Sequence, residues 1–582
     1  MTDYERLVVL NDQWTERTAA RQMDESGGEF AGGILDPLTG VAWPNHTTTV
    51  TAIEMWAGAL ANPDSSRYRD QELVVHLERA CRFMLDSQHE DGTISPGWTN
   101  YHSPPDTAFV VCALARVVEL CDRTGWDGFA PALTDLRLWL RRAIPAMLTG
   151  GCHTPNHRWV MTAALGYLHR MFGLPELVER AEAWLAEGLD ATPDGEWTER
   201  SNGIYNTVSD TMLIHASLLL AKPELLDPVR RNLKMMAYLV HPDGEVVTDY
   251  SGRQDFGHRH TLAYYYYPYR LMGELDCDPL FAAMADLAAE AIFVNDVPPN
   301  QAIVGHLLHP RWREQSGESG AVPESYRMIL NRDYAQDRAD DLAKLARNPQ
   351  PKPAHSGLHT EFGSPIARYR QGRTSVTAIT EAASFFSLRH GAVRLLGVQL
   401  ASSFDPGSIR MQELEEVPGG FRLYGSSTKG YYGPLPESEL TGRTTPWYLL
   451  PHGRRPMTHE QRHAVEALVT EMPGGWDITL RAVTPERVLT QVLFLFGEEG
   501  ELTADLPPVE ENGGRLGWTG GGVRYACGED WLRLEGGIRQ HGLSAIGHMT
   551  YPTGCIALVA HLLTPYSHTF RLHLSQHAES IE

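Results

Sequence analysis

The segment from residue 150 to residue 159 gathers side chains that could do chemistry at one predicted helix start. Gly150 and Gly151 favour the end of one helix, and Thr154 with Pro155 is typical of the N-cap and first position of the next. An amide, an imidazole and a guanidinium then lie beside free N–H groups at the positive end of a helix dipole. An ordinary polar cap, with Trp159 as a core anchor, is the alternative. The three polar residues are Asn156, His157 and Arg158.

Similar side chains follow other glycine turns in the first half of the chain, which contain Gly40, Gly92, Gly195 and Gly244. Aromatic rings stack on sugar faces, amides bond hydroxyls, and arginine or histidine pairs with carboxylate or sulfate. The set therefore favours an acidic carbohydrate as ligand; the alternative is that each loop only caps its own helices. The substrate-binding candidates are Trp98, Tyr101, His102, Arg158, Arg253, His258, Arg259 and His260.

Helices must hold these loops, because apolar residues recur at helical spacing through most of the first 300 residues. The glycine turns are 45 to 58 residues apart, a period typical of one helical hairpin per repeat. Such hairpins stack as a solenoid or close into an (α/α) toroid, and alternate loops then share one end. The predicted helices are Thr51–Ala61, Asp70–Leu85, Thr107–Cys121, Pro131–Met147, Arg158–Phe172, Pro175–Leu189, Asn206–Leu220, Pro223–Leu239, Thr261–Gly273 and Pro279–Ile292.

The pattern changes after about residue 317. One more helical element is expected at Tyr326–Leu345, and the proline-rich stretch Arg347–Pro353 is interpreted as a linker. Beyond it the apolar period is two, with glycine-rich turns such as Pro473–Trp476, which is typical of an antiparallel β-sandwich. The sequence thus predicts a multidomain α-then-β chain, an (α/α) toroid at 1–350 and a sandwich at 351–582. The predicted strands are Thr374–Thr380, Val393–Leu400, Phe421–Leu423, Ala464–Thr470, Ile478–Val483, Val488–Phe496, Trp531–Leu534 and Ile556–Leu563.

Composition narrows the class of protein. A hydrophobic content of 42% and a charged content of 21% are typical of a globular chain. The net charge of −23 argues against nucleic acid as a partner. The chain as given has no signal-peptide pattern and no membrane-length apolar run, so we expect a cytoplasmic protein, or a secreted one if a signal was removed. The seven cysteines are scattered and are interpreted as reduced thiols. Assembly into a homo-oligomer is left open.

At this point the sequence resembles the heparinase II/III-like and oligoalginate-type polysaccharide lyases, which combine a helical toroid with an antiparallel sandwich. In that family an adjacent Asn-His pair at a helix start and a Tyr about fifty residues later serve the active site. The matching residues here are Asn156, His157 and Tyr205, the last following the Asp194-Gly195 turn. The family commonly adds a His or Tyr from the junction or the sandwich, for which His355, His359 and His390 are candidates. The resemblance also implies a divalent metal in the sandwich of some members.

The chemistry of β-elimination needs these residue types. The C5 proton of a uronic acid is very weakly acidic until the adjacent carboxylate is neutralised or polarised, a task that suits Asn156. A base must then take the proton and an acid must protonate the leaving O4. Tyr205 can do either if basic neighbours lower its pKa, and His157 can be a base. The predicted catalytic residues are therefore Asn156, His157 and Tyr205, and the chemistry requires no cofactor.

Three alternatives remain open. His459-Glu460-Gln461-Arg462-His463 matches the H-E-x-x-H zinc motif of metallopeptidases, although it lies in the strand-rich region. A glycoside hydrolase on an (α/α) toroid would need paired carboxylates, for which there are four candidates. A carbohydrate-binding protein without activity would use the same loops. The carboxylate candidates are Asp106, Glu199, Asp210 and Asp255.

Overall fold

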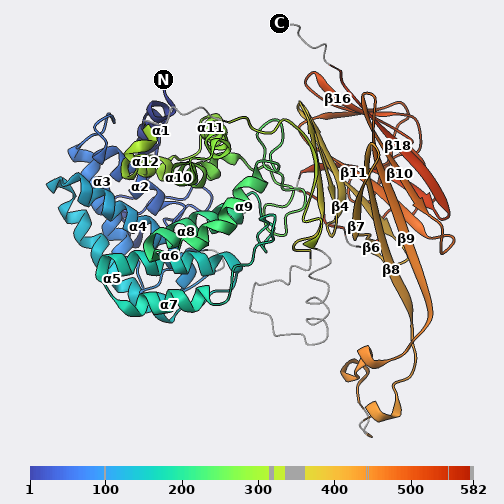
Figure 1. Ribbon diagram of the computed structural model, residues 1–582, viewed down its shortest axis with the longest axis horizontal. Helices are drawn as coiled ribbons and strands as arrows, with labels where there is room; N and C mark the ends of the chain where they lie inside the picture. Colours follow the sequence, from blue (N-terminus) through green and yellow to red (C-terminus); the bar gives the residue numbers. More distant parts are fainter. Residues whose placement is uncertain are drawn as a thin grey trace.

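The computed structural model of the chain has a helical domain followed by a sandwich of two β-sheets (Figure 1). It describes residues 1–97, 100–313, 320–334, 361–440, 442, 445–547, 549–552 and 554–576. Within these ranges every α-helix precedes the first strand, so the predicted α-then-β architecture is confirmed. None of the described helices is long and apolar enough to cross a membrane.

Six helices form an inner ring. The last of them, α12, packs against α2 and α4, so the ring closes and the helical domain is a toroid rather than an open solenoid. Almost every residue of α2 is buried, because helices surround it on several sides. The inner helices are α2 (Thr49–Ala61), α4 (Pro104–Thr124), α6 (Pro155–Phe172), α8 (Tyr205–Leu220), α10 (Tyr266–Asp276) and α12 (Asn300–Leu308).

A second set of helices lies outside the ring and buries one face. In α7 only Leu177 and Ala181 are buried, because its other side chains face solvent. The predicted helices are confirmed, whereas α1 and α12 lie outside the predicted set. The capping box of Thr2 and Glu5 at the start of α1 is a sequence signal for that helix. The outer helices are α1 (Asp3–Ala19), α3 (Gln71–Asp86), α5 (Ala130–Thr149), α7 (Pro175–Leu185), α9 (Leu226–Met236) and α11 (Pro279–Val294).

Three of the predicted glycine turns share one backbone pattern. The N–H groups of Gly92, Gly195 and Gly244 each donate to the carbonyl three residues earlier, and their φ angles are 84°, 106° and 84°. These turns precede the inner helices α4, α8 and α10, so these three helices are entered through equivalent loops. The predicted helix end at Gly150-Gly151 is confirmed, because Gly150 caps the C-terminus of α5, but its φ of −68° departs from the backbone pattern of the other three turns.

The sandwich consists of two sheets whose facing sides enclose a common apolar core. The strands of both sheets pair antiparallel, except β14 with β17. The first sheet runs β1 (Ser325–Leu330), β2 (Ile366–Gln371), β3 (Thr374–Ile379), β4 (Ser384–His390), β5 (Val393–Ser402), β11 (Leu489–Gly497), β17 (Cys555–Leu563), β14 (Arg515–Gly517) and β13 (Val509–Glu511), with β6 (Gly407–Ser408) beside β5. The second runs β12 (Glu501–Ala504), β15 (Val523–Cys527), β16 (Asp530–Glu535), β18 (Tyr566–Leu574), β10 (Gly475–Ala482), β9 (Met457–Met472), β8 (Gly420–Tyr432) and β7 (Glu413–Val417).

The start of the first sheet corrects one prediction. The expected helix at Tyr326–Leu345 is wrong for its first residues, because β1 occupies Ser325–Leu330 and pairs antiparallel with β2. A short apolar run fits either period, and here pairing with a distant strand decides it. The predicted linker lies outside the described residues, so the boundary at residue 350 stays a prediction. The predicted hairpin is confirmed: β9 and β10 flank Pro473-Gly474, and Gly474 has a φ of 78°.

Candidate active site

The start of α6 is fixed by a residue from another repeat. Pro155 is its first residue and Thr154 its N-cap, as predicted, but the Thr154 side chain makes no capping hydrogen bond. Glu199, in the loop before α8, accepts hydrogen bonds from the Asn156 backbone N–H at 2.9 Å and from Asn156 Nδ2 at 2.6 Å. The carboxylate thus satisfies a free N–H group at the positive end of the helix. Glu199 therefore both caps α6 and orients the Asn156 amide.

Arg253 extends this arrangement to Tyr205. Its guanidinium contacts the second carboxylate oxygen of Glu199 and lies over the Tyr205 ring, 4.3 Å from the ring centroid. Asn156, Glu199, Arg253 and Tyr205 are thus linked by direct contacts, and we call them the Asn156–Tyr205 network. They come from the starts of α6 and α8 and from two loops at the same end of the toroid. The structure therefore brings the predicted Asn156, Tyr205 and Arg253 together.

Tyr205 is held by the turn that precedes it. Its backbone N–H donates to Ser201 Oγ at 3.2 Å. Asp255 accepts from Ser201 Oγ and from the Gly203 N–H, each at 2.9 Å. Asp255 lies two residues after Arg253, so one short loop supplies the group over the Tyr205 ring and the carboxylate that orders its backbone. The ring is half-buried rather than enclosed.

Burial sets the protonation of the site. Burial raises the pKa of the Tyr205 phenol, and the Arg253 charge opposes that shift. Burial also raises the pKa of the Glu199 carboxyl, again opposed by Arg253. The pKa of His157 falls to about 3, because its ring is buried and lies near His153 and Arg253. His157 is therefore neutral near pH 7, and Tyr205 holds its proton there.

His157 lies in an aromatic pocket next to the network. Its ring packs edge-on against Phe109 and His153, with centroid distances of 6.3 and 5.0 Å. His46 stacks on Phe109, with 4.5 Å between the ring centroids, and burial lowers the pKa of His46 as well. Among the described residues His157 Nδ1 is buried with no hydrogen-bond partner. A neutral imidazole with a vacant ring nitrogen can accept a proton or a hydrogen bond.

Two of the predicted substrate-binding arginines are engaged elsewhere. Arg158 lies 2.9 Å from Asp190 and 3.3 Å from Glu187, and its guanidinium covers the Trp159 ring. It ties the start of α6 to the segment that follows α7, and it makes no hydrogen bond or ion pair with the network. Arg259 is largely exposed and lies 3.2 Å from Asp243. These contacts satisfy both cations within the protein.

The remaining predicted ligands that the structure describes form no hydrogen bond, ion pair or ring contact with the network. His102 stacks on His89 at 3.8 Å and lies 2.8 Å from Asp91. Tyr101 is 70% exposed, so its ring is available to a ligand. His260 is half-buried, and a Cβ on Gly203 would lie 2.6 Å from its ring, so it packs against the turn before Tyr205. His258 is exposed, and Trp98 lies outside the described residues.

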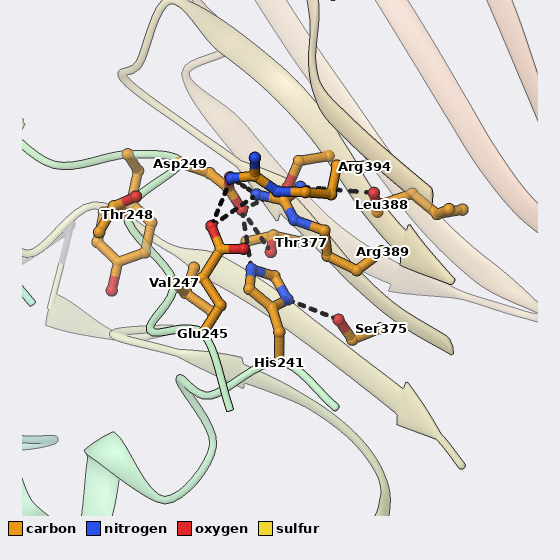
Figure 2. A network of polar contacts seen from close by, with 12 residues as sticks. His241, Glu245, Val247, Thr248, Asp249, Ser375, Thr377, Leu388, Arg389 and Arg394 are labelled. Atoms are coloured by element: carbon orange, nitrogen blue, oxygen red, sulfur yellow. Dashed lines mark hydrogen bonds and ion pairs between the residues drawn. The ribbon is translucent and has the colours of Figure 1, made fainter. Parts of the chain in front are cut away.

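The loop that carries Arg253 is also bound to the sandwich. Figure 2 shows His241, Glu245 and Asp249 of this loop facing Ser375, Arg389 and Arg394 from β3, β4 and β5. Arg389 Nη2 lies 3.1 Å from Asp249 Oδ1, and Arg394 Nη2 lies 2.8 Å from Glu245 Oε1. Both carboxylates are buried, which makes such pairs costly to break. Tertiary contacts with the first sheet therefore fix the backbone four residues before Arg253.

His241 completes this interface as a neutral residue. Its Nδ1 lies 2.7 Å from Ser375 Oγ, and Ser387 Oγ donates to Asp249 at 2.6 Å. Burial and the Arg389 charge hold the pKa of His241 well below its usual range. We call His241, Glu245, Asp249, Arg389 and Arg394 the interdomain network. The sequence does not predict this network, because the loop residues and the strand residues lie far apart in the chain. The only local signal is the pair of carboxylates that follows the Gly244 turn.

The H-E-x-x-H motif does not form a zinc helix. It lies in strand β9, where His459 is exposed and has a φ of 51°, while His463 is buried and lies 3.0 Å from the Thr484 carbonyl oxygen. The metallopeptidase alternative is therefore wrong, because two ligands one helical turn apart require a helix. No group of three or more metal-ligating side chains was found among the described residues.

Among the described residues, the other open candidates are engaged outside the network. His390 is buried between Thr374 and Ser575 inside the sandwich, and His355 and His359 lie outside the described residues. Asp210 is fully buried and accepts from Trp197 Nε1 at 3.0 Å. Asp106 accepts from Ser103 and Asn100, and Asp255 orders the turn before Tyr205. Of the four hydrolase candidates, only Glu199 belongs to the network.

Comparison with known proteins identifies the fold. No protein-family model matches the chain, and no curated protein matches it in sequence. Heparinase III aligns over 100% of this chain and 86% of its own, with a TM-score of 0.52 and 10% identity. A mutant of the heparan sulfate lyase HepC from Pedobacter heparinus aligns over 98% of this chain and 84% of its own, with a TM-score of 0.51 and 11% identity. A Paenibacillus xanthan lyase aligns over 100% of this chain and 58% of its own, with a TM-score of 0.51 and 10% identity. The resemblance predicted from the sequence is thus confirmed in the fold: the chain has the toroid-plus-sandwich fold of these polysaccharide lyases.

Proposed function

We propose that the protein is a polysaccharide lyase that cleaves a uronic-acid-containing glycan by β-elimination. The Asn156–Tyr205 network carries the proposal, because it joins an amide, a guanidinium and a phenol at the end of the toroid where the inner helices begin. Three solved structures that share the fold, a heparan sulfate lyase, heparinase III and a xanthan lyase, support it.

In this mechanism Asn156 polarises the carboxylate of the sugar. Glu199 fixes one amide hydrogen, and the second is shared only weakly with Thr154 Oγ1 at 3.4 Å. Asn156 is fully buried in the structure, so the proposed mechanism requires the start of α6 to open enough for a carboxylate oxygen to reach this second hydrogen, which is worth more in a site shielded from water. The chemistry requires stabilisation of the doubly charged intermediate that forms when C5 loses its proton, and a preoriented amide next to an arginine supplies it.

Tyr205 moves the proton. Its phenolate takes the C5 proton, the C4=C5 double bond forms, the C4–O4 bond breaks, and the phenol returns the proton to O4. Arg253 over the ring stabilises the phenolate, opposing the effect of burial. Neutral His157 beside the network accepts a hydrogen bond from the bound sugar. The substrate-binding roles of Tyr101, His102, His258 and His260 remain part of the proposal.

A panel of uronic-acid polymers and oligomers, followed by far-ultraviolet absorbance, tests this function. The unsaturated product absorbs because its double bond is conjugated with the carboxylate, and we expect absorbance to rise with at least one substrate. Asn156→Ala and Tyr205→Phe should abolish most of that rise. New reducing ends without absorbance would identify a glycoside hydrolase instead. Binding without any product would identify a carbohydrate-binding protein.

A further inference from the structure

The hairpin of β8 and β9 continues beyond the sandwich as an arm, which Figure 1 shows projecting away from both domains. We define the arm as residues 429–462. Inside the sandwich β9 alternates between buried and partly buried positions, but residues 457–462 are all exposed. The facing end of β8 also loses its burial. A two-stranded ribbon exposed on both faces is marginally stable in water by itself, so the arm needs a covering surface.

The described residues at the end of the arm combine fixed contacts with exposed apolar side chains. Arg455 donates to the Gly433 carbonyl at 2.9 Å and to His452 Nδ1 at 3.1 Å, and its guanidinium lies 4.6 Å from the Trp447 ring centroid. These contacts preorganise the loop, which lowers the entropy cost of binding. Six large apolar side chains are exposed there, which marks an interaction surface. They are Tyr431, Tyr432, Leu440, Trp447, Tyr448 and Leu449, with exposed fractions of 55% to 89%.

The arm differs in charge from the rest of the chain. Residues 429–462 contain five Lys and Arg against three Glu, a net charge of +2, whereas the whole chain carries −23. Residues 1–313 contain 25 Lys and Arg against 42 Asp and Glu, a net charge of −17. A basic arm is therefore complementary to the helical domain, and electrostatic complementarity selects partners. Its own helical domain is out of reach in the structure (Figure 1).

We propose that the arm docks on the helical domain of a second copy of this chain. The exposed leucines favour a protein surface over a glycan, because aliphatic side chains do not stack on sugar rings as aromatic ones do. A symmetric pair would use two arms, and the four aromatic side chains of each would bury on the order of 500 Å². Two arms with their partner surfaces then exceed the roughly 1,000 Å² expected of a specific interface. This inference is independent of the catalytic proposal.

Sedimentation velocity over a wide concentration range tests the proposal. We expect the wild-type chain to be a dimer that weakens as salt is raised, since charge attraction is screened. Trp447→Ala and Tyr448→Ser should each weaken it about 30-fold or more, as expected for a central aromatic residue of an interface. Val483→Ser, which removes an apolar side chain 66% exposed outside the arm, should leave it unchanged. A wild-type monomer, or variants that dimerise normally, would overturn the proposal.

A mixing experiment distinguishes the docking surfaces. In an arm-truncated chain, Tyr432 and Met457 are joined by a short Asn-Gly turn. We expect this truncated chain to be monomeric alone. It should still form a mixed pair with the wild type, because it keeps the acidic helical domain on which the wild-type arm docks. Loss of self-association without any mixed pair would mean that arms dock on each other, which contradicts the proposal. The third outcome is a wild type that is monomeric and is retained by an acidic polysaccharide gel, with a Trp447→Ala variant that is not retained. That outcome would assign the arm to glycan binding instead.

Discussion

At the scale of residues, the site depends on one carboxylate. Glu199 joins Asn156, which begins an inner helix, to Arg253, which covers the ring of Tyr205. The residue pattern together with the family resemblance identifies Asn156 and Tyr205 as candidates, but Glu199 is assigned only to a hydrolase alternative. In the structure Glu199 is a positioning residue: it holds the amide and the guanidinium in the geometry that the proposed elimination needs.

Tyr205→Phe tests the proton transfer. We expect a folded protein that binds substrate but forms unsaturated product at least ~100-fold more slowly, since general acid–base catalysis contributes typically 10²–10⁴-fold. Tyr68→Phe is a matched control, because Tyr68 also has an arginine over its ring, 5.0 Å away, but lies outside the network. Retention of most activity by Tyr205→Phe would leave His157 or a residue not yet identified as the group that moves the proton.

The pH dependence of kcat/KM separates tyrosine from histidine as the base. The raised pKa of Tyr205 makes its phenolate a minor form at neutral pH, whose population grows about tenfold per pH unit. We therefore expect the rate to keep rising between about pH 7 and pH 9, above the ordinary histidine range. His157, with a pKa of about 3, adds no change there. A rate that reaches its plateau near pH 7 would contradict proton removal by Tyr205.

At the scale of elements, a repeated glycine turn aligns the loops. Gly195 and Gly244 have the same backbone hydrogen bond and similar φ angles of 106° and 84°. They differ in surroundings, since a Cβ on Gly195 would lie 2.3 Å from the Arg231 carbonyl carbon and one on Gly244 would meet nothing within 4 Å. The first turn is therefore packed against the backbone of α9, and the second meets no such contact.

Alanine at these two positions separates conformation from packing. Gly244→Ala should destabilise the protein by about 1–2 kcal/mol, the cost of a left-handed conformation with a side chain. Gly195→Ala should cost more, because the backbone near Arg231 must also move. Thermal and urea unfolding followed by circular dichroism measure both. Equal losses for the two variants would show that the close approach at Gly195 relaxes without cost.

At the scale of the whole molecule, the sandwich supports the loop that carries Arg253. The interdomain network buries two carboxylates of the helical domain against two arginines of the first sheet. Breaking such a pair from one side leaves an uncompensated buried charge, which is more costly than losing an exposed pair. Folding of the sandwich and order at the site are therefore coupled.

Asp249→Ala tests this coupling. We expect a loss of up to about 3–5 kcal/mol in stability, because Arg389 stays buried and keeps only the more distant carboxylate of Glu245, 3.6 Å away. We also expect lower kcat, since the loop of Arg253 loses its attachment four residues away. Asp505→Ala is the control: its pair with Arg533 is exposed on the sandwich and should be worth less than about 1 kcal/mol. Full activity and stability in Asp249→Ala would show that the loop is fixed by the turn before Tyr205 alone.

The sequence by itself determined most helices, several strands and the α-then-β order, because helical and strand periods are local properties of the chain, but it missed α1, α12 and β1. It located the repeat near 50 residues, the start of α6 at Pro155 and Asn156 as a candidate, and the family resemblance added Tyr205. Tertiary structure decided the rest. Arg158 pairs with Asp190, β1 pairs with β2, and Glu199 reaches Asn156, and each of these depends on a partner that lies far along the chain. A residue's type shows which bonds it can make, whereas only the closed toroid and its contact with the sandwich select the partner.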